Sequence, residues 1–212
     1  MAVTTMRGRL DEEDIKRLVR ATDPDDRATS AHKICRRIAA GSLTDSDREA
    51  AREILDYIMA DAAETVRRAL AVTLKNSPQL PHDLALRLID DVESIAVPVL
   101  ESSPVLTDDD LIRIVEGGVE SKQVSIARRQ SVTTRVVRAI TERGSEKAVA
   151  TVAANDGAQF DRSAYASALR RWGKSAAVTD GFIARSHIPV DVAEKMVALV
   201  SDAALKRLAT RR

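Results

Sequence analysis

Apolar residues recur at spacings of three and four along most of the chain, which is the pattern of helices that bury one face. Over the first 60 residues, this pattern predicts three helices. One begins at the acidic run 11–14, one restarts at Pro24 and runs towards Gly41, and one follows a capping sequence at Thr44. The alternating pattern of a strand bounded by a two-residue turn does not occur. The predicted fold class is therefore all-α.

From about residue 61 the sequence repeats itself. Segment 76–80, which contains Pro78, returns 26 residues later as segment 102–106, which contains Pro104. Each unit predicts two short helices separated by a proline or polar break, because proline lacks an N–H group and clashes with the preceding turn. We count five units, of which the last two are less regular.

A pair of short helices cannot bury its own apolar face, whereas stacked pairs share a continuous core. The sequence therefore predicts an α-solenoid of two-helix repeats over residues 61–212, preceded by a helical cap or bundle over residues 1–60. We expect the two parts to form one continuous domain. A compact helical bundle is the alternative. If the repeats stack, Leu100 and Leu111 should be buried between helices.

Four motifs in the repeat region together resemble a known family. They are D-x-x-x-x-V-R-x-x-L-A-x-x-L over residues 61–74, I-A-V-P-V-L-E-S-S-P-V-L over 95–106, D-L-I over 110–112 and I-A-R-R over 126–129. This set resembles the uncharacterised bacterial family called domain of unknown function 2336, found largely in alphaproteobacteria. The resemblance extends over roughly residues 25–212. A looser likeness to HEAT-like and leucine-rich-variant repeats implies a HEAT-like helical fold. The resemblance supplies no catalytic or ligand-binding residues.

Composition narrows the function classes. Lys and Arg total 33 against 32 Asp and Glu, a net charge of +1, which argues against a tail that binds polyanions. The single cysteine, Cys35, excludes an internal disulfide framework and a multi-cysteine zinc site. There is no apolar stretch of membrane-spanning length and no apolar secretory signal, so we expect a cytoplasmic location and no membrane partner. Because phosphate-binding glycine motifs do not occur, we expect no cofactor.

Three candidate chemistries are each weaker than a structural interpretation. His32 and Cys35 could supply two metal ligands, but a zinc site usually needs more, and no metal site is predicted. His32 could also accept a phosphoryl group, although the glycine expected soon after such a histidine is absent. Tyr165 and Trp172, seven residues apart, could frame a base in a glycosylase, but five aromatic residues are too few to support this. We predict that the protein is not an enzyme.

The strongest candidate site is cationic and consists of Arg128, Arg129, Arg135 and Arg138. Equivalent positions of stacked repeats line one face, so these residues could form a ridge that binds acidic helices or phosphates. We predict a non-catalytic scaffold or adaptor for protein–protein interaction that uses the surface of the repeats. The expected partner is another protein, and a homodimer is left open.

The alternative is a nucleotide or nucleic acid held by the same arginines, which ranks below a protein partner. A basic face without carboxylates would favour a phosphate ligand. A groove of mixed charge with exposed apolar residues would favour a protein partner.

Overall fold

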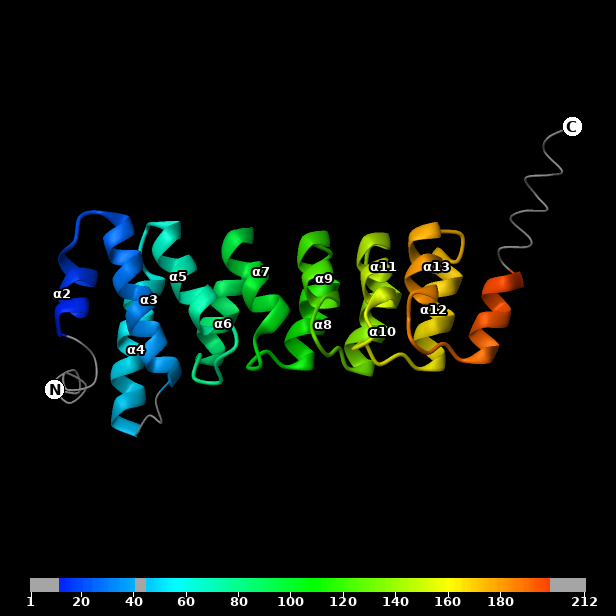
Figure 1. The fold of residues 1–212 in the computed structure, drawn as a ribbon, viewed down its shortest axis with the longest axis horizontal. Helices are drawn as coiled ribbons and strands as arrows, with labels where there is room; N and C mark the ends of the chain where they lie inside the picture. Colours follow the sequence, from blue (N-terminus) through cyan, green and yellow to red (C-terminus); the bar gives the residue numbers. More distant parts are fainter. Residues whose placement is uncertain (1–11, 41–44, 199–212) are drawn as a thin grey trace, which may run out of the picture. The chain divides into compact units, whose positions relative to one another are not determined.

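The structure, a computed structural model, describes residues 12–40 and 45–198, and nearly all of them lie in helices or short connections (Figure 1). Within these ranges no strand is formed, and a single isolated parallel bridge joins Val132 and Ala158. The predicted all-α fold class is confirmed. The chain divides into two compact units, Met1–Leu106 and Thr107–Arg212.

The helices of the first unit are α2 (Glu12–Arg20), α3 (Pro24–Ala40), α4 (Asp45–Met59), α5 (Glu64–Leu74), α6 (His82–Ile89) and α7 (Glu93–Ser102). Those of the second are α8 (Asp108–Glu116), α9 (Glu120–Ala127), α10 (Thr134–Arg143), α11 (Glu146–Ala154), α12 (Arg162–Trp172) and α13 (Ala176–Ile183). A further helix covers residues 190–198. The predicted capping sequence at Thr44 lies outside the described residues.

In the first unit, α3, α5 and α7 pack side by side, and α4 and α6 pack against this layer. The core between them is aliphatic: Ile34, Leu55, Leu70, Leu84 and Leu100 are each at most 1% exposed. The helices of segment 1–60 therefore share a core with those that follow residue 61. Leu100 is buried as predicted.

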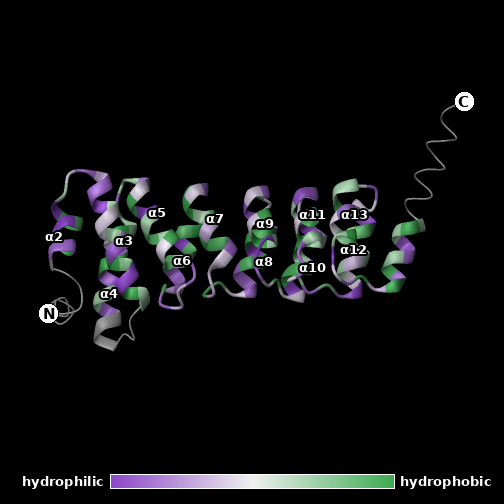
Figure 2. Ribbon diagram, viewed as in Figure 1, coloured by the Kyte–Doolittle hydropathy of each residue, from purple (hydrophilic) through white to green (hydrophobic). Residues whose placement is uncertain are grey.

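In the second unit the helices form two layers. α8, α10 and α12 follow one another in the first layer, and α9, α11 and α13 follow one another in the second. Small and β-branched residues such as Val136, Ala148 and Val152 are fully buried where the layers meet. Hydrophobic and hydrophilic positions alternate along each of these helices (Figure 2), as expected for helices that bury one face. The paired helices agree with the predicted two-helix repeat.

Helix ends follow the sequence signals closely. Thr107 and Asp110 form a reciprocal capping box at the start of α8, and Gly117 ends that helix. Thr133 and Ser145 accept hydrogen bonds from main-chain N–H groups at the starts of α10 and α11. These caps satisfy amide groups that have no partner within the helix. The starts of these helices are therefore fixed by side chains within three residues of them.

Main-chain hydrogen bonds join the loop before α10 to the loop before α12. Val132 donates from its N–H to the carbonyl of Gly157 at 3.1 Å and accepts from the N–H of Gln159 at 2.9 Å. A Cβ atom at Gly157 would lie 1.9 Å from the carbonyl oxygen of Gln130, so only glycine permits this approach. Asn155 adds hydrogen bonds from its amide to the carbonyls of Ala127 and Arg129. These bonds connect successive repeats at their loops.

Candidate functional site

The four predicted site arginines lie near the junction of α9 and α10. Arg128, at the end of α9, is exposed, and Arg129 is partly buried. Burial lowers the pKa of the Arg129 guanidinium, and the charge of Asp108 acts in the opposite direction. Arg135 and Arg138 extend from exposed positions of α10.

Carboxylates interleave with this arginine set. Arg135 makes an ion pair with Asp109 at 2.6 Å, and Nε of Arg138 donates to Asp161 at 2.8 Å. Arg138 lowers the pKa of the Asp161 carboxyl chiefly by donating a hydrogen bond to it. Asp161 also caps α12 by accepting from the N–H of Ala164. The set is thus a surface of mixed charge.

Two arginines of the first unit form ion pairs with aspartates from other segments. Arg67 donates from Nε and Nη2 to the two carboxylate oxygens of Asp91, at 2.6 and 2.9 Å. Arg27 pairs with Asp61 in the same way, at 2.7 and 3.0 Å. The side chains of all four residues are at most 17% exposed. These arginines join neighbouring helices, and sequence reasoning did not identify that role.

Two arginines of the second unit bind main-chain oxygens. Arg171 donates to the carbonyls of Thr141 and Gly144, at 2.8 and 3.0 Å. Arg185 donates to the carbonyls of Ala153, Asn155 and Ala158, and its guanidinium also lies over the ring of Phe160. Both residues cover carbonyl groups at the ends of preceding helices, where partial negative charge accumulates.

The thiol of Cys35 is fully buried in α3. Burial raises its pKa to about 12, so a thiolate nucleophile is not available near neutral pH. Nδ1 of His32 lies 2.7 Å from the hydroxyl of Thr73, and that hydroxyl donates to the carbonyl of Ala69. The histidine therefore donates through Nδ1, with the imidazole exposed. Among the described residues, no cluster of His, Cys, Asp and Glu could hold a metal ion.

The two aromatic residues considered for base recognition have structural surroundings. Tyr165 is 5% exposed and packs against Phe160 and Phe182, with ring centroids 4.8 and 5.3 Å away. The guanidinium of Arg171 lies 5.4 Å from the ring centre of Trp172. These contacts form part of the core and its edge in the last repeats.

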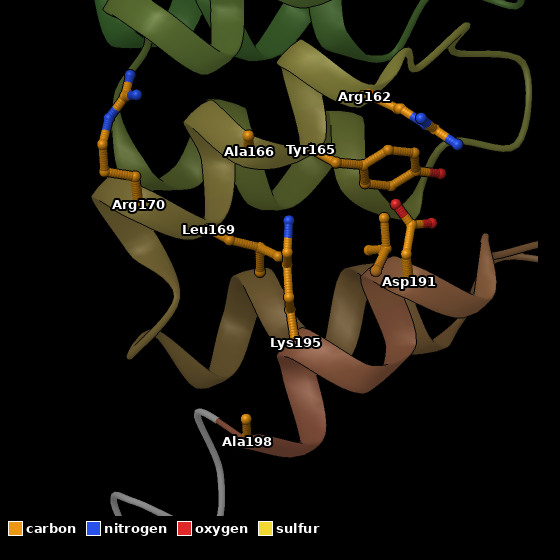
Figure 3. A pocket seen from close by; sticks show the side chains of 9 residues that line it. Arg162, Tyr165, Ala166, Leu169, Arg170, Asp191, Lys195 and Ala198 are labelled. Atoms are coloured by element: carbon orange, nitrogen blue, oxygen red, sulfur yellow. The ribbon is translucent and has the colours of Figure 1, made fainter.

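A hollow in the second unit lies between α12 and helix 190–198 and has a volume of about 600 Å³ (Figure 3). We call it the α12 groove. One wall is formed by Arg162, Tyr165, Ala166, Leu169 and Arg170, and the other by Asp191, Val192, Lys195 and Ala198.

The floor of the α12 groove is apolar and its rim is charged. Leu169 and Val192 line the groove and are nearly buried, so they form its floor. Arg162 and Arg170 lie at opposite ends of one wall, and Lys195 points in from the other (Figure 3). No ion pair joins Arg162 or Lys195 to a described residue. The spacing of the α12 residues was visible in the sequence, but the helix that faces them could not be paired with α12 from spacing alone.

Comparison with known proteins bears on the family. The profile of a family described as "uncharacterised protein conserved in bacteria (DUF2336)" matches residues 95–212, more than half of the chain. The chain belongs to the DUF2336 family. The predicted resemblance is thereby confirmed for this part, while its predicted extension to residue 25 lies beyond the match. No curated protein and no solved structure matches the chain. The DUF2336 match includes the whole of the α12 groove.

Within the described residues, no helix has both the length and the apolarity needed to cross a membrane.

Proposed function

We propose that this DUF2336 protein is a non-catalytic interaction module that binds another protein on the surface of its helical repeats. The observation that carries the proposal is the α12 groove, in which an apolar floor containing Leu169 and Val192 lies beneath a charged rim. Protein interfaces commonly combine an apolar centre with a polar edge. A hollow between two helices is also a common seat for a partner's side chains.

Exposed apolar residues on the last two described helices favour the same function. Ile183 is 65% exposed, Val190 is 74% exposed and Val197 is 66% exposed. Ile183 is the last residue of α13, and Val190 and Val197 lie on helix 190–198, which is the next helix in the chain. Such side chains are available for apolar contact with another macromolecule.

The alternative, a phosphate ligand held by the predicted arginines, has less support. Arg135 and Arg138 already contact Asp109 and Asp161, so a bound phosphate would meet carboxylates as well as cations. Mixed charge is the condition that favours a protein partner over a polyanion.

Site-specific photocrosslinking in the native bacterium tests the proposal. We expect p-benzoylphenylalanine in place of Ala166, an exposed groove residue, to give a protein adduct after irradiation. The matched control replaces Ala176, which is also exposed on a helix but lies outside the groove. The adduct protein, purified, should bind the wild type and bind Ala166→Arg at least tenfold more weakly. Adducts of equal yield at both positions, or at neither, would exclude the groove as the binding surface.

A further inference from the structure

We propose that the α12 groove binds an acidic amphipathic helix of the partner protein. This inference rests on the proposed function and adds the chemistry of the partner. It depends on the arrangement of apolar and charged residues on two facing helices, and on basic groove residues that form no ion pair with any described residue.

The two walls are each a single helical face. The α12 residues of the groove stand at positions 162, 165, 166, 169 and 170, and those of the facing helix at 191, 192, 195 and 198. Both sets follow the three-and-four spacing that places residues on one side of a helix. Two such faces enclose a trough, and a third helix laid along it would meet side chains from both walls.

Small residues leave room for a helix to approach. Ala166 stands between the two arginines of α12, and Ala198 lies at the end of the facing wall (Figure 3). Leu169 and Val192, 8% and 4% exposed, offer the apolar contact beneath them. An apolar stripe on the partner helix would therefore be covered in the centre of the trough.

The charge of the rim selects an acidic partner. Among the described residues that line the groove, Arg162, Arg170 and Lys195 are basic and Asp191 is acidic, so this lining has an excess of positive charge. By contrast, Arg67 and Arg138 elsewhere in the protein are each paired with an aspartate. In the described residues, neither Arg162 nor Lys195 has such a pair. Carboxylates on the partner would supply the missing neutralisation.

The spacing of the cations favours a helix over a phosphate ligand. Arg162 and Arg170 are eight residues apart on α12, which corresponds to about 12 Å along the helix axis. The Arg162 and Arg170 side chains also extend away from each other (Figure 3), so one phosphate group does not contact both in this arrangement. Two carboxylates about two turns apart on a helix have a matching separation.

Charge also argues against the chain's own final segment as the occupant. Residues 199–212 contain four basic residues, Lys206, Arg207, Arg211 and Arg212, and one acidic residue, Asp202. A cationic rim repels such a segment. The partner helix is therefore expected to come from another protein.

Peptide selection on the full-length protein tests the inference. The probe is a library of random 16-residue peptides displayed on phage, selected against the immobilised wild type. We expect enriched peptides to carry Asp or Glu beside apolar residues at helical spacing. Binding of the synthetic peptides should weaken at least tenfold in the variant Arg162→Glu/Lys195→Glu, and also in 0.5 M NaCl.

The matched control is Arg143→Glu/Lys174→Glu, which changes net charge equally at two exposed positions outside the groove. It should bind within twofold of the wild type. Circular dichroism checks that both variants fold, and Ala166→Lys serves as a second groove variant.

Several outcomes would overturn the proposal. These are no enrichment, enrichment of neutral or basic peptides, or equal binding to both charge variants. Full competition by inorganic phosphate or by a U-rich RNA would identify a phosphate ligand instead. Competition by a synthetic 199–212 peptide would identify the chain's own segment. A dimer in sedimentation that Ala166→Lys disrupts would identify a second copy. A groove-specific photoadduct together with any of these failures would leave the interaction function standing and reject only the acidic helix.

Discussion

Arg27 and Arg67 make the same contacts at two successive positions of the first unit. Nη1 of Arg27 donates to the carbonyls of Ala21 and Thr22, six and five residues earlier. Nη1 of Arg67 donates to the carbonyls of Asp61 and Ala62, at the same two offsets. Each guanidinium also holds an aspartate from a later segment. α3 and α5 are therefore equivalent elements, although they lie on opposite sides of residue 60.

Breaking a buried ion pair should lower the free energy of unfolding more than breaking an exposed ion pair. We expect Arg67→Ala to lower the free energy of unfolding by about 2–4 kcal/mol, because it leaves the carboxylate of Asp91 poorly solvated and without its partner. Arg135→Ala is the control, since Arg135 and Asp109 are 62% and 79% exposed, and it should cost at most about 1 kcal/mol. Urea unfolding measures both. Equal costs would show that the buried pair is not a stabilising contact.

Acid should destabilise the first unit through the same aspartates. Arg27 lowers the pKa of Asp61, and Arg67 lowers that of Asp91, chiefly by donating hydrogen bonds. Below the unfolded-chain pKa of about 3.9, the unfolded state takes up these protons more readily than the folded state. The stabilisation is thus complete above that pH and is lost as the pH falls through the lower folded-state values.

Urea unfolding at pH 6, 4 and 3 measures this effect. We expect the free energy of unfolding of the wild type to fall more steeply over this range than that of Asp91→Asn, which has no carboxyl to protonate at that position. Parallel pH profiles for the two proteins would contradict the proposed linkage.

Truncating either of two core leucines should lower the free energy of unfolding markedly. Leu100 is 0% exposed and Leu111 is 4% exposed. We expect Leu100→Ala and Leu111→Ala each to lower the free energy of unfolding by about 2–5 kcal/mol, because each leaves a cavity between packed helices. Val72, 47% exposed on α5, provides the control, and Val72→Ala should change stability by about 0.5 kcal/mol or less. Thermal or urea unfolding decides between these values.

Replacing two of the predicted site arginines should not change the affinity of the protein for phosphate ligands. We expect Arg128→Ala/Arg135→Ala to match the wild type in fluorescence anisotropy with labelled ATP and a labelled single-stranded RNA. The reason is that Asp109 already pairs with Arg135 in this mixed-charge surface. A tenfold or greater loss of affinity in the double variant would instead support the phosphate alternative.

The single thiol should react slowly in the native state. Cys35 is 0% exposed, and burial raises its pKa to about 12. Because the thiolate is the reactive form, we expect an aromatic disulfide reagent to label Cys35 in denaturant but hardly at all in the folded protein at pH 8. Labelling at comparable rates under both conditions would mean that α3 opens readily.

The predicted repeat was accurate where the signals are local. The starts of α8, α10 and α11 follow from Thr107, Thr133 and Ser145, because a cap is made within three residues of the helix it begins. The burial of Leu100 follows from helical periodicity. By contrast, no local signal indicates that Arg67 binds Asp91, which lies 24 residues away in the chain. Nothing in the spacing of charges reveals which carboxylate a guanidinium contacts.

The sequence by itself determined the helices, their caps, the 26-residue step and the family, since these depend on neighbours along the chain or on motifs read directly. Only the tertiary structure decided which arginines form ion pairs and where a groove lies on the surface. Arg138 meets Asp161 because α10 and α12 pack side by side. The α12 groove exists because helix 190–198 faces α12 across a gap. Such pairings depend on distances between helices, which local sequence patterns do not encode.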